Sequence, residues 1–120
     1  MQKIESGNES EAHQVQQLLA LLNDLEAELS DKSLWSDIAP SETALNSLVP
    51  FAIDTLTFSQ WLQFIFIPKM SMLVQQNLPL PRTMLVLPMA EESFKNIAVD
   101  SAGLLVIIGR IDRLLSDPSR

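Results

Sequence analysis

Few side chains in this sequence are of the types that carry out catalysis or bind metals. The only histidine, His13, follows Glu9 by four residues, so a helix would place both on one face as a pair of metal ligands. Two ligands are fewer than a zinc site needs, so we expect a solvent-exposed histidine. The chain has no cysteine, which excludes disulfides, thiolate ligands and cysteine nucleophiles. The sequence therefore predicts neither a metal nor another cofactor.

The carboxylates are the remaining candidates for chemistry. Glu91 and Glu92 are adjacent, so on a helix they diverge by about 100° and do not face each other as an acid–base pair. We expect them to complement a helix N-terminus instead. Asp54 lies beside a hydrophobic segment and is expected to be a helix cap or a buried carboxylate with satisfied hydrogen bonds; the alternatives are a partner-facing or a catalytic carboxylate. Because one carboxylate lacks a base or nucleophile beside it, and the common nucleotide-binding and hydrolase motifs are missing, the sequence argues against an enzyme.

The net charge of −7 is unevenly distributed. Residues 1–56 contain ten acids and two lysines, a net charge of −8, whereas residues 57–120 have a net charge of +1. Lys and Arg supply most of the non-specific affinity for phosphates, so we expect no direct binding of nucleic acid. The acidic half would attract a basic protein partner. The first residues lack the apolar run of a secretory signal, which predicts a cytoplasmic location.

Residues 9–30 have the periodicity of an amphipathic helix. Apolar residues recur at spacings of 3, 4, 3 and 4 and so form one seam along the helix. The seam consists of Val15, Leu18, Leu22, Leu25 and Leu29. It predicts a helix packed within its own domain, and the alternative is a homodimeric coiled coil through residues 15–29.

A second, more hydrophobic helix is predicted over residues 58–76, with Thr57 and Gln60 spaced as a capping box. Its apolar side chains cover nearly the whole circumference, which is typical of a helix inside a bundle or a membrane. The longest uninterrupted apolar run, residues 64–67, is four residues long, against about 18 for a membrane span. The sequence therefore excludes a membrane segment and favours a central bundle helix.

Three polar or helix-breaking residues interrupt this central helix. Pro68 has no N–H and crowds the preceding turn, so we expect a kink there. Gln63 is expected on the one hydrated side of the helix. Lys69 is expected to extend its ammonium group to solvent.

The other segments complete one helical domain over residues 1–120, with residues 1–8 flexible and 117–120 frayed. Ser41 is the predicted N-cap of a short helix that ends near residue 48. Alternating prolines make residues 77–81 an extended connector, and the conformation of residues 82–87 stays open. Two more helices are predicted, from Pro88 to about residue 96 and from about residue 100 to 115. Gly103 and Gly109 in the last helix are expected to permit close helix approach.

One stretch resembles a known family. The run from Pro50 to Met70, PFAIDTLTFSQWLQFIFIPKM, looks like the signature of the YqcC-like family of small uncharacterised bacterial proteins. Leu34-Trp35, Leu78-Pro79 and the segment LPMAEE at residues 87–92 continue the resemblance. The resemblance implies an all-α fold and supplies no catalytic residues. Similar members are commonly encoded beside a tRNA pseudouridine synthase, which implies an accessory role in tRNA modification.

Together these patterns predict an all-α protein, an irregular bundle of four to five helices around a central, Pro-kinked helix. We expect a non-enzymatic interaction module whose partner is a tRNA pseudouridine synthase. The alternative is a small-molecule or lipid-binding helical module with an apolar cavity near Trp61. The candidate partner-binding residues are Asp54, Gln63, Lys69 and Pro79.

Overall fold

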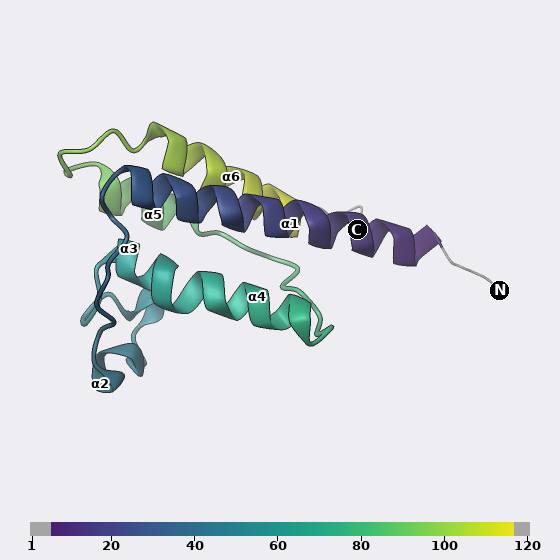
Figure 1. Cartoon of the computed structure of the whole chain (residues 1–120), viewed down its shortest axis with the longest axis horizontal. Helices are drawn as coiled ribbons and strands as arrows, with labels where there is room; N and C mark the ends of the chain where they lie inside the picture. Colours follow the sequence, from purple (N-terminus) through teal and green to yellow (C-terminus); the bar gives the residue numbers. More distant parts are fainter. Residues whose placement is uncertain (1–5, 117–120) are drawn as a thin grey trace.

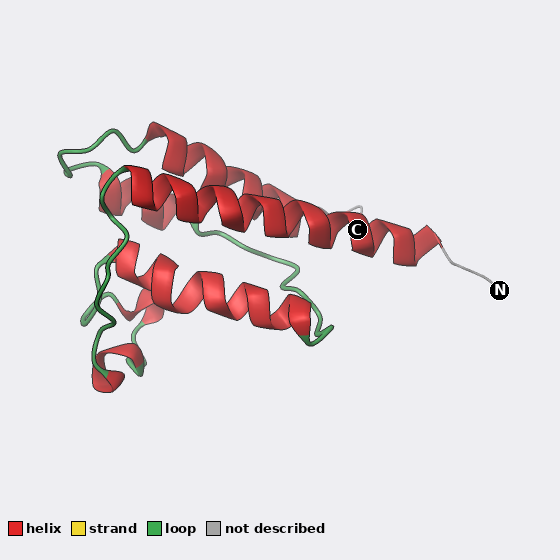
Figure 2. Cartoon of the chain, in the orientation of Figure 1, coloured by secondary structure: helices red, strands yellow, loops and turns green. Residues whose placement is uncertain are grey.

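The computed structural model describes residues 6–116, and this part of the chain is helical with no strand (Figure 2). The longest helix, α1 (Ser6–Asp31), runs antiparallel to the last helix, α6 (Ala102–Leu115), and the two pack side by side (Figure 1). The helix α5 (Leu87–Phe94) packs against α6. The continuous helical stretch that ends in α4 (Ile67–Gln75) lies beside α1 and runs in the direction of α6. The predicted all-α bundle is confirmed.

The predicted seam of α1 forms the centre of the core. Leu18, Leu25 and Leu29 have no solvent-exposed surface and Leu22 is almost fully buried. They pack against buried leucines and isoleucines of α6, so this seam is used within the chain. A homodimer through residues 15–29 stays a prediction, and it would have to use other side chains of α1. The helix begins at Ser6, earlier than expected, so residues 6–8 are helical, whereas residues 1–5 and 117–120 lie outside the described part.

The segment between α1 and the central helix contains two short helical turns. The helix α2 (Glu42–Leu45) begins as predicted, with the Ser41 hydroxyl accepting a hydrogen bond from the Ala44 amide at 3.1 Å. The 3₁₀ turn η1 (Pro50–Ala52) follows. This segment forms one corner of the molecule, away from α1 and α6 (Figure 1). Its position leaves much of its surface uncovered by other elements.

The central helix consists of α3 (Phe58–Trp61), the π-helical turn η2 (Leu62–Phe66) and α4. The predicted capping box is present: the Thr57 hydroxyl accepts from the Gln60 amide at 3.1 Å, and the Thr57 amide donates to the Gln60 side chain at 2.9 Å. The distortion expected at Pro68 takes the form of the π turn immediately before it. There the Ile67 amide donates to the Leu62 carbonyl, five residues back. A widened turn is a known way to accommodate a residue that has no amide hydrogen.

A buried carboxylate from α6 completes the N-terminus of α5. Asp112 is 7% exposed, and its carboxylate accepts hydrogen bonds from the Val86 amide at 2.9 and 3.0 Å and from the Leu87 amide at 2.8 Å. Pro88 occupies the first turn, as predicted. Glu91 and Glu92 lie beyond the first turn, so the expectation that they complement this helix start was wrong. The start of α5 is instead complemented by Asp112, which lies 25 residues after Leu87 in the sequence.

The same end of α6 holds the segment whose conformation the sequence left open. The Ser116 hydroxyl accepts from the Met84 amide at 2.7 Å and donates to the Met84 carbonyl at 3.2 Å. These two hydrogen bonds, together with those from Asp112, fix residues 84–87 along α6. The Leu85 side chain is largely exposed.

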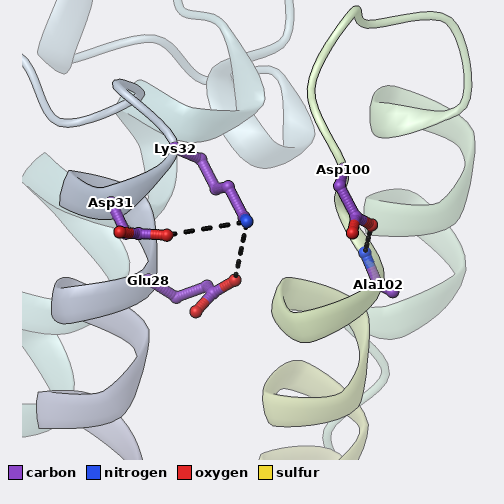
Figure 3. A network of polar contacts seen from close by, with 5 residues as sticks. All are labelled: Glu28, Asp31, Lys32, Asp100 and Ala102. Atoms are coloured by element: carbon purple, nitrogen blue, oxygen red, sulfur yellow. Dashed lines mark hydrogen bonds and ion pairs between the residues drawn. The ribbon is translucent and has the colours of Figure 1, made fainter.

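The N-terminus of α6 lies close to the C-terminal end of α1 (Figure 3). Lys32 pairs with Glu28 at 3.8 Å and with Asp31 at 3.6 Å, and the Asp100 carboxylate accepts from the Ala102 amide at 3.1 Å. A Cβ atom on Gly103 would come within 2.5 Å of the Glu28 carboxylate. Gly103 therefore permits the close approach that was predicted, and the acidic groups here complement the start of α6.

Gly109→Ala is expected to raise the free energy of unfolding by up to about 1 kcal/mol, because alanine is the better helix former by that amount. The added Cβ would meet Leu87 Cδ2 at 3.4 Å, an ordinary contact distance. Urea denaturation measures the change, with Gly103→Ala as the matched control. That control must displace the Glu28 carboxylate and should gain less. A Gly109→Ala variant less stable than the wild type would contradict the packing described.

Candidate functional site

The four residues predicted to bind a partner do not gather in one place. Asp54, Lys69 and Pro79 are exposed, whereas Gln63 is buried. Asp54 follows η1, Lys69 lies in α4, and Pro79 lies beyond the end of α4. Gln63 and Pro79 are far apart, because the twelve helical residues between Gln63 and the end of α4 span about 18 Å. The binding roles of Asp54, Lys69 and Pro79 stay predictions, but the four residues do not form a single site.

Gln63 was expected on the hydrated side of the central helix, and this was wrong. It is 7% exposed and forms two hydrogen bonds with the backbone of Ser36, 27 residues earlier. The Ser36 amide donates to Gln63 Oε1 at 2.8 Å, and Gln63 Nε2 donates to the Ser36 carbonyl at 2.8 Å. A buried amide is tolerated when its polar atoms are paired in this way. Gln63 therefore anchors the segment that leads from α1 into the corner of the molecule.

Asp54 has a defined task within the corner segment. Its carboxylate accepts a hydrogen bond from the Ser47 hydroxyl at 2.6 Å, and the same hydroxyl accepts from the Val49 amide at 3.1 Å. Nearby, the Thr55 hydroxyl donates to the Ala44 carbonyl at 2.7 Å. These bonds connect the two sides of the loop that contains η1. Asp54 acts here as a loop-closing acceptor, in place of the helix cap that the sequence allowed.

The backbone at η1 is strained. Phe51 and Ala52 have φ angles of 59° and 49°, in the left-handed region that residues with a Cβ seldom adopt. Conformations of this kind persist only where the surroundings enforce them. The Phe51 ring contacts Trp61 at a centroid distance of 4.8 Å and Phe58 at 6.0 Å, and Ala52 is buried. The loop is thus held against the central helix by an aromatic contact.

The aromatic cluster around Trp61 packs against the core and leaves little space for a ligand. Trp61 also stacks on Phe58 and Phe66 at centroid distances of 5.6 and 5.3 Å. The cavity beside it, lined in part by Phe58 and Met89, has a volume of about 20 Å³. Sites for small molecules usually measure roughly 300–1,000 Å³. This geometry does not favour the small-molecule or lipid-binding alternative at the predicted position.

A larger depression lies between the first and last helices. It is an open groove of about 470 Å³ between α1 and α6, lined by residues that include Leu21, Arg110 and Arg113. Both arginines are exposed, and Arg113 lies in the last turn of α6, where a cation complements the helix dipole. The sequence did not single out this groove, because its walls come from the two ends of the chain.

Of the pair considered for metal binding, Glu9 and His13, the structure describes only the His13 side chain. No group of three or more His, Asp or Glu side chains in the described part of the chain is arranged to hold a metal ion. His13 is exposed. Within residues 6–116, no helix has the length and apolar character needed to cross a membrane.

The corner segment exposes large apolar side chains. Leu48 is 99% exposed, Ile38 80% and Ile53 58%. Exposed acids lie in the same segment, so the corner combines apolar and negative groups. The corner surface is defined here as Asp37, Ile38, Glu42, Leu48, Ile53 and Asp54. Contiguous exposed apolar patches bordered by polar residues mark contact sites in proteins, and these residues share one segment of the chain.

The fold is that of a small helical protein that exposes apolar side chains at one corner. The chain belongs to the DUF446 family, described as tRNA pseudouridine synthase C, which matches residues 17–114. It is 32% identical to the uncharacterised protein YqcC of Escherichia coli over 80% of this chain and 88% of that protein. The solution NMR structure of that protein superposes with a TM-score of 0.76 at 30% identity, covering 87% of this chain and 89% of the other.

Two further relatives match a shorter stretch of 74 residues, 62% of this chain. An uncharacterised protein of Haemophilus influenzae is 35% identical, and the match covers 70% of its length. A protein of Pectobacterium carotovorum named tRNA pseudouridine synthase C is 39% identical, but the match covers only 19% of its length. The chain thus spans about a fifth of that relative.

Proposed function

We propose that this chain is a non-enzymatic accessory module that binds a tRNA pseudouridine synthase. The observation that carries the proposal is the match to the Pectobacterium protein, named tRNA pseudouridine synthase C, of which the matched stretch is 19%. In that protein the similar stretch and the rest of the named synthase belong to one polypeptide, which supports an association between this chain and such an enzyme. The family description carries the same name.

Two features of the chain itself support a binding role. Asp54, the carboxylate considered for catalysis, is hydrogen-bonded to Ser47 and helps to close the loop around η1. The N-terminal 56 residues have a net charge of −8, and a surface of one sign speeds encounter with a partner of the opposite sign. Enzymes that act on tRNA need basic surfaces to hold phosphates, so such an enzyme is an electrostatically suitable partner.

Isothermal titration calorimetry tests the proposal, with this chain titrated into the tRNA pseudouridine synthase of the organism that encodes it. We expect binding that weakens as salt rises from low to physiological concentration, because screening acts on exposed charges. Titration into tRNA alone is the control and should produce no binding signal. Absence of binding to the synthase at both salt concentrations would contradict the proposal.

A further inference from the structure

The backbone on both sides of Leu48 is held in place by ordered contacts. Leu48 lies next to Ser47, whose hydroxyl donates to the Asp54 carboxylate at 2.6 Å. On the other side, the strained backbone at Phe51 is fixed by the ring contact with Trp61 at 4.8 Å. A side chain that is 99% exposed on a fixed backbone loses little backbone entropy when a partner covers it. Leu48 therefore has the properties of a binding anchor.

The charged residues of the chain segment that contains this anchor have one sign. Residues 33–68 contain three acids, Asp37, Glu42 and Asp54, and no Lys, Arg or His. All three are exposed, and none forms an ion pair within the described part of the chain. Lys32, the basic residue just before this stretch, is already paired with Glu28 and Asp31. The acids of the corner surface are thus available to a cationic partner.

We infer that the corner surface docks on a basic protein surface that contains an apolar recess for Leu48. This inference deepens the proposed function, on which it rests, by naming the docking residues and the chemistry of the complementary face. The three acids would pair with Lys and Arg of the partner and set the rate of encounter, while Leu48 and Ile53 would supply the buried contact.

The acids of the corner surface disfavour three other kinds of binding partner: nucleic acid, an anionic membrane and a second copy of the chain. Phosphates of nucleic acid and anionic lipid headgroups would be repelled by the acids. A second copy of the chain in a two-fold dimer would bring the same patch against itself, acid against acid. A basic protein surface is the occupant that both the apolar and the charged groups accommodate.

The first test measures how tightly two leucine variants of this chain bind to the same synthase. Leu48→Ala is expected to weaken binding at least tenfold, mainly through faster dissociation, because buried anchors carry much of the affinity. Leu85→Ala is the matched control, since Leu85 is 70% exposed but lies outside the corner surface. The affinity of this variant for the synthase should stay within about twofold of wild type. Because Leu48 makes almost no contact in the free chain, its loss should leave the unfolding curve unchanged.

A second pair of variants tests the charges. Asp37→Asn with Glu42→Gln is expected to slow association severalfold at low salt, with the difference disappearing at high salt. Asp24→Asn with Glu26→Gln on α1 removes the same charge from exposed positions elsewhere and should change the rate less. Surface plasmon resonance at two salt concentrations measures both rates.

The outcomes separate this inference from the proposed function. No binding by the wild-type chain would contradict the proposed function itself. Binding that Leu48→Ala leaves unchanged would overturn the docking inference alone, as would equal effects of the two charge variants. Sedimentation velocity of the free chain should show a monomer, and a dimer that Leu48→Ala dissociates would assign the surface to a second copy.

Discussion

Replacing Asp112 by alanine is expected to lower the free energy of unfolding by about 3 kcal/mol. The carboxylate is 7% exposed and accepts from two backbone amides, Val86 and Leu87, at 2.8–3.0 Å. Alanine would leave both donors without a partner, and an unsatisfied buried donor costs about 1–3 kcal/mol. Asp112 also places a negative charge at the N-terminus of α5, which its helix dipole favours.

Urea denaturation followed by circular dichroism measures the loss. Asp112→Asn retains one acceptor oxygen without the charge, so its loss should be intermediate. Asp24→Ala on the exposed face of α1 should change stability by less than about 0.5 kcal/mol. A loss below about 1 kcal/mol for Asp112→Ala would show that the cap contributes little. Faster hydrogen exchange at the Val86 and Leu87 amides would locate the effect at the start of α5.

Replacing Gln63 by alanine is expected to lower the free energy of unfolding by about 2 kcal/mol. Gln63 donates to and accepts from the Ser36 backbone, both at 2.8 Å, and is itself buried. Gln63→Leu preserves most of the volume but offers no polar group. If the two hydrogen bonds dominate, Leu should be nearly as destabilising as Ala; if the cavity dominates, Leu should restore most of the stability.

The affinity of the Gln63 variants for the synthase shows whether this anchor also matters for binding. Because Gln63 anchors the segment that enters the corner, its loss should loosen residues 36–38 while the core stays folded. We therefore expect weaker binding to the synthase for Gln63→Ala, although Gln63 itself is buried and does not touch a partner. Affinity equal to that of the wild type would show that the corner surface does not depend on this anchor.

The parts of the fold that were predicted correctly are those set by neighbouring residues. One example is the leucine spacing, which repeats along α1. Two others, the Thr57–Gln60 capping box and the first-turn position of Pro88, depend on residues within the first turn of a single helix. Their geometry follows from helix periodicity and from the hydrogen-bonding groups of the side chains. The family resemblance carried by residues 50–70 agreed with this result.

The parts that were missed depend on long-range contacts. Asp112 and Val86 are 26 residues apart, and Gln63 and Ser36 are 27 apart, so no local pattern indicates either pair. The left-handed conformation of Phe51 is disfavoured for its residue type and exists because Trp61 and Phe58 hold the ring. Likewise, no local pattern indicates that the apolar residues Leu48 and Ile53 are exposed.

Hydrogen–deuterium exchange of this chain, free and with the pseudouridine synthase, shows whether the corner segment is the docking surface. We expect reduced deuterium uptake at short exchange times in peptides that cover residues 36–57, and little change in peptides from α1 and α6. Uptake that is unchanged throughout the chain, or reduced only in α1 and α6, would contradict this assignment.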